Sequence, residues 1–264
     1  MRLFERRARG ISPTPAGDAL VCTAREIFGV LERSGKELSA LAAGMVGSLA
    51  VGCNYSAAAM LVPQSVLALS RREPRLSISV REGPRQLLLE DLRAHRLDVV
   101  VARLDPHATA DAQDLHVQEL WDEPLCIVCA AGHPLARRGR IPWKALGEYP
   151  WIMPLRDSPA RAGLDAVLRG HGVQLPHSRI ESTSTRVNQW MLREIDALTV
   201  MALPEAKQYA AAGLLAVLPV KLPLAFGKLA AMTVKERPRS DAVSAFLDCV
   251  WQQQPALALR KRRG

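Results

Sequence analysis

The chain lacks any run of about 18 consecutive apolar residues, the length that a membrane-spanning helix needs. Its first fifteen residues carry charge but no apolar segment, so they do not form a secretory signal peptide. Five cysteines occur, an odd number with scattered spacing, which does not fit a disulfide framework. These absences predict a cytoplasmic protein that does not insert into a membrane.

The sequence also lacks the motifs of common metal and catalytic sites. The six histidines show no HxxxH or HxH spacing, and neither G-x-S-x-G nor a glycine-rich phosphate loop occurs. The single CxxC, from Cys126 to Cys129, lies in an apolar segment that reads as a strand. Residues three apart on a strand point to opposite faces, so this pair can neither hold zinc nor form a redox couple. We therefore expect two buried hydrophobic cysteines, no metal, no cofactor and no catalytic residue.

Basic residues are present in excess, but they are concentrated in three places. The formal net charge is +9, and residues 1–14, 137–140 and 260–263 together account for it. The rest of the chain is close to neutral, so the charge does not coat the protein. Residues 256–264 are expected to form a solvated basic tail, with contact to nucleic acid as the alternative.

Residues 15–45 show the longest regular pattern. Thr14 before Pro15 is a favourable helix start, with a hydroxyl cap and a proline at the first helical position. Apolar residues then recur at alternating steps of four and three, as in a coiled-coil seam. This narrow stripe predicts a dimerisation helix, and the alternative is an amphipathic helix that lies on its own domain. The seam residues expected to mediate dimerisation are Leu20, Ala24, Ile27, Leu31, Leu38 and Leu41.

The body of the chain alternates strand-like and helix-like segments. Strands are predicted at residues 48–53, 76–80 and 97–102, with helices at 57–70 and 86–95 between them. This order favours an α/β unit with a parallel sheet. A second round follows, with strands expected at 125–130, 151–153, 179–181, 197–202, 214–218 and 228–233, and helices at 160–171, 187–194, 204–212 and 241–253. The fold class is therefore α/β, with two Rossmann-like subdomains and a ligand cleft between them.

Several short motifs, in this order and spacing, resemble LysR-type transcriptional regulators. Residues 3–17 read LFERRARGISPTPAG, similar to the wing and linker helix of that family, and residues 133–136 read HPLA. The resemblance implies a remnant winged-helix wing and linker helix at 1–46, followed by a periplasmic-binding-protein-like effector domain at 47–255. Subdomain I would comprise 47–120 and 226–255, and subdomain II 121–225. Residues 80–104 look most like the branch that responds to sugars or aromatic acids.

The same resemblance implies the partners and a departure from the family pattern. Regulators of this type bind DNA and a small-molecule effector and form homodimers or homotetramers. A helix-turn-helix precedes the LFER element in the family, whereas two residues precede it here, so we expect a truncated form without a recognition helix. The arginines that remain for contact with phosphates or a minor groove are Arg2, Arg6, Arg7 and Arg9.

Candidate effector-binding residues in the first half follow three predicted strands. Ser56 matches an effector-contacting position of the family, although it also suits a plain helix cap. The loop at residues 83–85 matches a second effector loop, with Pro84 in place of a polar residue and Arg85 after it. Arg103 follows the third strand, where it could bind an effector carboxylate or form a salt bridge with Asp105 or another acid.

Candidate residues in the second half border two expected helix starts. Arg156, Ser158 and Arg161 surround the first start, and Thr183 and Ser184 precede the second. Hydroxyl side chains before a helix serve first as caps, and as a ligand wall in the alternative. The function expected from all these features is an effector-responsive LysR-like regulator that is not an enzyme. A two-lobed solute-binding protein is the alternative, and no acid, base and nucleophile set supports an enzyme on this scaffold.

Overall fold

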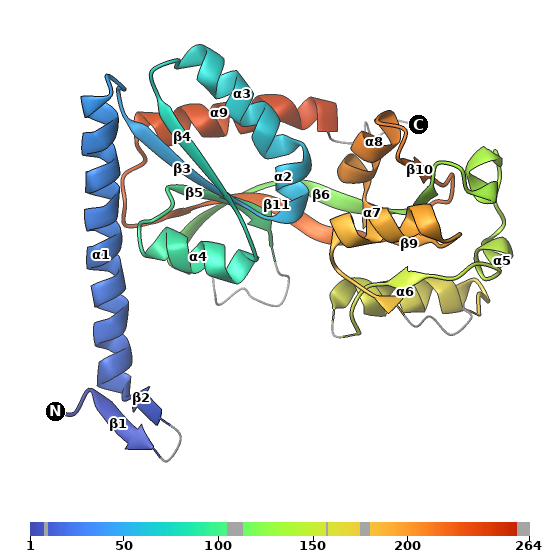
Figure 1. Ribbon diagram of the computed structural model, residues 1–264, viewed down its shortest axis with the longest axis horizontal. Coiled ribbons are helices and arrows are strands. Elements are labelled where there is room, and N and C mark those ends of the chain that lie inside the picture. Colours follow the sequence, from blue (N-terminus) through green and yellow to red (C-terminus); the bar gives the residue numbers. More distant parts are fainter. Residues whose placement is uncertain (8–9, 105–112, 157, 175–179, 258–264) are drawn as a thin grey trace. The chain divides into compact units, whose positions relative to one another are not determined.

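A computed structural model describes residues 1–7, 10–104, 113–156, 158–174 and 180–257 (Figure 1). The chain divides into two compact units. Unit 1 comprises Met1–Ala102, His107–Glu119 and Ala230–Gly264, and unit 2 comprises Arg103–Pro106 and Leu120–Leu229. Within the described ranges, no helix is both long and apolar enough to cross a membrane.

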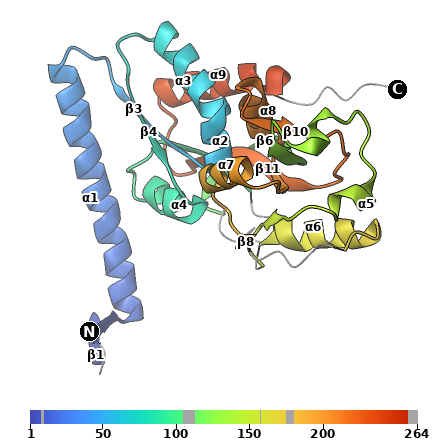
Figure 2. The same cartoon turned by 45° about the vertical axis from the view of Figure 1, so that its right-hand side comes forward.

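Unit 1 begins with a β-hairpin and a long helix. Strands β1 (Phe4–Arg7) and β2 (Gly10–Pro13) pair antiparallel, and helix α1 (Pro15–Ala42) follows directly. The side chain of Thr14 caps α1 by accepting a hydrogen bond from the backbone N–H of Gly17 at 3.1 Å, which confirms the predicted helix start. Figures 1 and 2 show the hairpin at the N-terminal end of α1, at the far end from the helices of unit 1.

The sheet of unit 1 is parallel at its centre, as predicted. Strand β3 (Ser48–Cys53) pairs in parallel with both β4 (Ser77–Glu82) and β5 (Val99–Arg103). The order β11-β5-β3-β4, in which β11 is Ala225–Val234, places β4 at the edge. Val51, Val99, Val100 and Val101 are fully buried, as continuous apolar strands in a sheet covered on both faces should be.

Helices α2 (Tyr55–Ala59), α3 (Leu61–Arg72), α4 (Arg85–Arg93) and α9 (Asp241–Leu257) complete unit 1. The prediction of one continuous helix over 57–70 is wrong, because the chain breaks at Met60, with φ −146° and ψ −50°. Pro63 then lies in the first turn of α3, where a missing backbone N–H costs little. The apolar spacing continues across the break and therefore does not reveal it.

The strands of unit 2 run in mixed directions. Strand β6 (Leu115–Ala130) pairs antiparallel with β9 (Thr199–Ala202) and with β10 (Leu215–Val217). The strands β7 (Ile152–Met153) and β8 (Ile180–Glu181) pair in parallel. The parallel Rossmann-like pattern expected for this half is therefore only partly correct. The mixed α/β class itself is confirmed.

Two long strands contribute to both units. The first residues of β6 belong to unit 1 and the rest to unit 2, while β11 (Ala225–Val234) begins in unit 2 and ends in unit 1. Only the last part of β6 was predicted, at 125–130. Polar and charged residues such as His116, Glu119 and Asp122 interrupt the apolar pattern of its first part.

The core of unit 2 lies on both faces of β6. Ile127 and Cys129 belong to one buried cluster, and Cys126 and Val128 belong to another. Burial raises the pKa of the Cys126 and Cys129 thiols to about 12. The two thiols thus lie buried in separate clusters on opposite faces of β6, as expected for cysteines three apart on a strand. The helices of unit 2 are the 3-10 helix η2 (Pro134–Arg137), α5 (Trp143–Leu146), α6 (Pro159–Gly170), α7 (Thr185–Glu194) and α8 (Leu203–Ala211), of which η2 and α5 were not predicted.

Candidate functional site

In unit 1, Ser56 follows β3 and is half-buried in the first turn of α2. The cap of this helix is Asn54, whose Oδ1 accepts a hydrogen bond from the backbone N–H of Ala57 at 3.3 Å. The Nδ2 of Asn54 donates to Oγ of Ser56 at 3.0 Å. The alternative that Ser56 is the cap is therefore wrong, because Asn54 has the extended backbone of a cap and Ser56 lies inside the helix.

The loop at residues 83–85 follows β4, the neighbour of β3 in the sheet. Since Cys53 pairs with Glu82, the two loops leave the sheet at the same edge. Pro84 is the residue before α4 and supplies no side-chain cap, so the backbone N–H groups of the first turn receive no hydrogen bond from a cap side chain. Arg85 begins the helix, and within the described residues it makes no ion pair and its buried Nε has no hydrogen-bond partner.

Arg103, at the end of β5, is already paired with an acidic side chain. Its Nε and Nη2 donate to the same oxygen, Oε2 of Glu123, at 3.0 and 2.9 Å. Glu123 is only 2% exposed and lies on β6 within unit 2. An effector carboxylate at Arg103 would therefore compete with a buried ion pair. Asp105, the other acid considered for this role, lies outside the described residues.

In unit 2, Arg156 and Arg161 converge on Glu181 at the end of β8. Nε of Arg156 donates to Oε1 of Glu181 at 2.9 Å, and Nη1 of Arg161 donates to the same oxygen at 3.2 Å. Nε of Arg161 also donates to Oδ2 of Asp165 at 2.9 Å. The hydrogen bond from Arg156 makes the largest contribution to holding the pKa of Glu181 below its ordinary value, and the hydrogen bond from Arg161 acts in the same direction.

The hydroxyl residues near these arginines act as helix caps. Oγ of Ser158 accepts from the backbone N–H of Arg161 at 3.2 Å, and Oγ of Ser184 accepts from that of Val187 at 3.4 Å. Thr183 is exposed beside the second cap. Since β7 and β8 are parallel neighbours, the two helix starts that follow them lie at one edge of unit 2.

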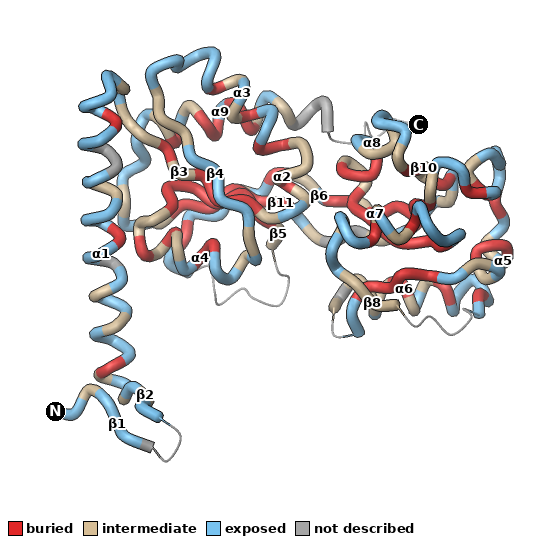
Figure 3. Tube along the Cα trace, viewed as in Figure 1, coloured by how far each residue is buried: buried red, intermediate tan, exposed pale blue. Residues whose placement is uncertain are grey.

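The predicted seam of α1 faces away from the body of unit 1. Along this stripe Leu20 is 50% exposed, Ile27 56%, Leu31 61%, Leu38 68% and Leu41 59%. At 100° per residue, the buried positions Gly29 and Ala40 lie on the opposite side of the helix. Figure 3 shows that most of α1 is exposed. The alternative, in which the stripe packs on its own domain, is therefore not the observed arrangement; Ala24, also on the seam, is half-buried.

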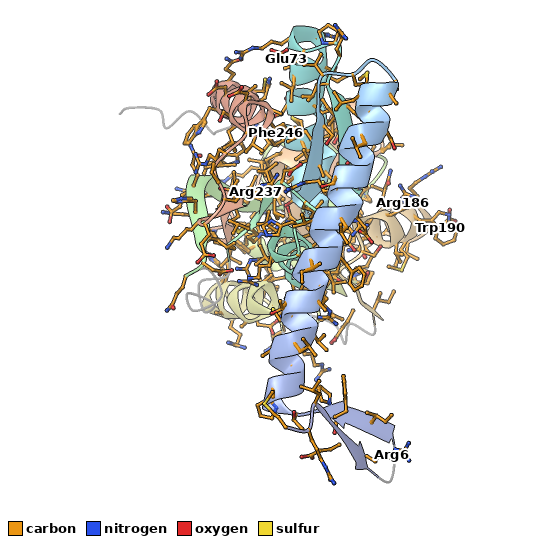
Figure 4. The ribbon with its side chains drawn as sticks, turned by 90° about the vertical axis from the view of Figure 1, so that its left-hand side faces the viewer. Arg6, Glu73, Arg186, Trp190, Arg237 and Phe246 are labelled. Atoms are coloured by element: carbon orange, nitrogen blue, oxygen red, sulfur yellow. The ribbon has the colours of Figure 1, made fainter. Side chains whose placement is uncertain are left out.

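The described basic side chains of the N-terminus lie on the hairpin and just before it. Arg2 and Arg6 are exposed, and Figure 4 shows Arg6 on the hairpin below α1. Arg9, the side chain of Arg7 and the tail at 258–264 lie outside the described residues.

Sequence reasoning missed one pocket in unit 2. It has a volume of about 510 Å³ and contains none of the predicted effector residues. His133 of the HPLA motif borders it, and its Nδ1 accepts a hydrogen bond from the backbone N–H of Leu135 at 3.1 Å. Burial lowers the pKa of His133 below its ordinary value of 6.5. The histidine thus caps η2 in its neutral form, a role that the sequence motif alone does not reveal.

Comparisons with known proteins assign the chain to a family. Residues 42–255 match the model of the LysR substrate binding domain. The regulator GbpR of Azospirillum brasilense is 34% identical over 246 residues, which cover 93% of this chain and 71% of that protein. GalR of Pseudomonas putida is 28% identical over 253 residues, which cover 95% of this chain and 62% of that protein.

A solved structure shares the fold. The effector-binding domain of QuiR in complex with shikimate has a TM-score of 0.61 at 19% identity, with 81% of this chain and 99% of that domain covered. The curated relatives are transcriptional regulators rather than enzymes, and they favour a regulator over a solute-binding protein. The family model and the identity to GbpR together show that this chain belongs to the LysR family of transcriptional regulators.

Proposed function

We propose that this chain forms the dimerising and effector-responsive part of a cytoplasmic, DNA-binding regulator. The observation that carries this proposal is the exposed heptad stripe on α1, on the side of the helix opposite Gly29 and Ala40. Exposure of a row of leucine and isoleucine to water is unfavourable, and burial of the row against a second helix lowers the free energy. A second copy of this chain offers the matching row, so the partner is a homodimer mate. Residues 1–46 are the dimerisation and wing segment in this proposal, and residues 47–255 the effector domain.

The effector that the residues suit best is a small molecule with a carboxylate. Arg85 supports this, because it makes no ion pair within the described residues, whereas Arg103, Arg156 and Arg161 each hold an acid. The N–H groups of the first turn of α4, which have no side-chain cap, favour the same charge. QuiR, with the same fold, is known with the carboxylate shikimate. The other residues that we propose for effector contact are Ser56 and Pro84 in unit 1, and Arg103, Arg156, Ser158, Arg161, Thr183 and Ser184 in unit 2.

Thermal unfolding with added ligands tests this proposal. We expect at least one hydroxylated carboxylate in a panel headed by shikimate to raise the Tm, and uncharged galactose to leave it unchanged. Arg85→Ala should abolish the rise, because the carboxylate loses its cation. Arg169→Ala, at an exposed arginine in the last turn of α6, is the matched control and should keep the rise. A panel without any effect, or an Arg85→Ala variant that responds like the wild type, would contradict the carboxylate assignment.

DNA contact in this proposal is made by the hairpin. Arg2, Arg6, Arg7 and Arg9 would neutralise phosphates and carry no sequence information themselves. Effector binding then shifts the population between two arrangements of the dimer on DNA.

A further inference from the structure

The helix that carries the seam meets the rest of unit 1 through a contact of main chain with main chain. A Cβ atom placed on Gly29 of α1 would lie 1.5 Å from the carbonyl oxygen of Ala94, closer than real Cβ atoms approach. Gly29 is buried and Ala94 is 5% exposed. Figures 1 and 2 both draw α4, which ends at this point, beside α1. Only glycine at position 29 allows this approach.

A tight turn holds the carbonyl of Ala94 in place. After α4, the N–H of His95 bonds to the carbonyl of Leu92 at 3.1 Å and that of Arg96 to the carbonyl of Asp91 at 2.8 Å. This is the Schellman pattern, which normally has glycine at its left-handed position. Here His95 has φ +56°, an unfavourable conformation for a residue with a Cβ. The chain thus maintains a strained turn at the place where α4 meets α1.

The other end of α4 begins in the loop at residues 83–85. Between the two ends, Leu88, Leu89 and Leu92 are at most 2% exposed, so the helix is fixed along its buried side. A helix of this length spans about 13 Å. It therefore connects the loop to Gly29 as one rigid element.

A second contact of the same kind joins α1 to the hairpin. A Cβ atom on Gly17 would lie 1.9 Å from the carbonyl oxygen of Leu3. The N–H of Thr14 bonds to that same oxygen at 3.0 Å, and Oγ1 of Thr14 bonds to the carbonyl of Arg2 at 2.9 Å. The hairpin is thus tied to the first turn of α1 and moves with it.

The geometry points to α4 as a relay, an element that transmits movement from residues 83–85 to α1. Gly29 and Ala94 are the positioning residues, and their main-chain contact, which we call the joint, sets the orientation of α1 on unit 1. A displacement at residues 83–85 moves α4, the carbonyl of Ala94 presses on Gly29, and α1 turns together with the hairpin. Side chains change rotamer to absorb small movements, but two touching main chains have no such freedom. The relay rests on the proposed function only where it assigns the loop to an effector, and the joint itself is independent of any ligand.

Pulsed EPR distances test the joint without a ligand. Spin labels are attached to Ala19→Cys on α1 and Ser70→Cys on α3, both exposed positions of unit 1, in a Cys22→Ser background. The other four cysteines are buried, and the labelled chain is diluted with unlabelled chain so that each dimer contains one labelled copy.

Gly29→Ala and Gly35→Ala form a matched pair of variants on α1. A Cβ at Gly35 meets nothing within 4 Å, whereas the new Cβ at Gly29 must move from the Ala94 oxygen by about 1.5 Å or more. We expect the distance distribution to shift or broaden in Gly29→Ala and to match the wild type in Gly35→Ala. Identical distributions in both variants would overturn the joint. His95→Val, a β-branched residue that disfavours the left-handed backbone of this turn without a clash at Gly29, should also broaden the distribution and serves if Gly29→Ala does not fold.

Gly52→Ala tests the relay along α4. Its Cβ would lie 2.6 Å from Cδ1 of Leu97, 3.1 Å from Cδ2 of Leu88 on α4 and 3.1 Å from Cγ2 of Val100. These side chains are at most 3% exposed and have little room to change rotamer, so we expect the new methyl group to push α4 away from β3. We expect this variant to shift the distance between the labels when Gly29 is present and to add nothing in the Gly29→Ala background. An unchanged distance with Gly29 present, or the same added shift in both backgrounds, would overturn the relay. Because no effector is added, neither outcome depends on the proposed function.

Discussion

The guanidinium of Arg103 and the carboxylate of Glu123 form a two-bond ion pair at the end of strand β5. Both Nε and Nη2 of Arg103 donate to Oε2 of Glu123, at 3.0 and 2.9 Å. The Glu123 side chain is almost fully buried, while 28% of the Arg103 side chain is exposed. A carboxylate in such a place needs its cation, because desolvation strongly disfavours an unpaired buried charge.

Arg103→Ala should therefore destabilise the fold. Removal of the cation from buried Glu123 is expected to lower the free energy of unfolding by about 2–4 kcal/mol, measured by urea denaturation. Arg156→Ala is the control, since the Arg156 side chain is 82% exposed in its pair with Glu181 and should cost less than about 1 kcal/mol. Equal, small losses in the two variants would show that Arg103 is not structural.

Leu31→Lys should prevent dimerisation. A charge in the middle of the seam cannot be buried against a second helix without a large desolvation cost. We expect sedimentation velocity to show a dimer for the wild type and a monomer for the variant. Leu67→Lys on α3 replaces a leucine of similar exposure, 56% against 61%, outside the seam, and should remain dimeric. A dimer of unchanged mass in Leu31→Lys would rule out the seam as the interface.

His133 should make stability depend on pH. Burial lowers its pKa from 6.5, so the unfolded chain binds a proton at a higher pH than the folded chain does. The contribution of neutral His133 to the free energy of unfolding is fully present above pH 6.5. It is lost as the pH falls from there through the pKa of His133 in the folded chain. We expect the free energy of unfolding to fall more between pH 7 and 5.5 in the wild type than in His133→Asn, which retains a capping oxygen for the N–H of Leu135. Parallel profiles would contradict this assignment.

The cysteines should differ sharply in reactivity. Cys22 is exposed, whereas burial raises the pKa of Cys53 to about 11 and of Cys126 and Cys129 to about 12, and it also raises the pKa of Cys249. Since the thiolate is the reactive form, iodoacetamide at pH 8 should add one group to the native chain and five in urea, counted by mass spectrometry. Rapid native labelling at Cys126 would show that its strand opens.

Local periodicity made much of the fold predictable. The seam of α1, its start at Thr14 and the three central strands of unit 1 follow from spacing within the segment itself. The break at Met60 does not, because two short helices with a shared apolar face have the same pattern as one long helix. The first part of β6 was missed for the opposite reason, since its charged residues hide an extended backbone.

The site was harder to predict because its residues act through partners far away in sequence. Glu123 lies twenty residues after Arg103, and no local pattern pairs them. Asn54 and Ser56 are both good capping residues, and only the backbone conformation shows that Asn54 is the cap. The glycine contact of α1 with Ala94 is equally invisible in the sequence, where Gly29 looks no different from Gly35.

The way the chain passes between the two units determines the order in which they can form during synthesis. Unit 1 contains the first third of the chain, but its helix α3 packs on α9, and β11 lies next to β5 in its sheet. Residues 120–229 of unit 2 are all made before α9 leaves the ribosome. The first unit to be translated is thus the last to complete its core. Its apolar strands stay exposed to chaperones and proteases until the final helix has been made.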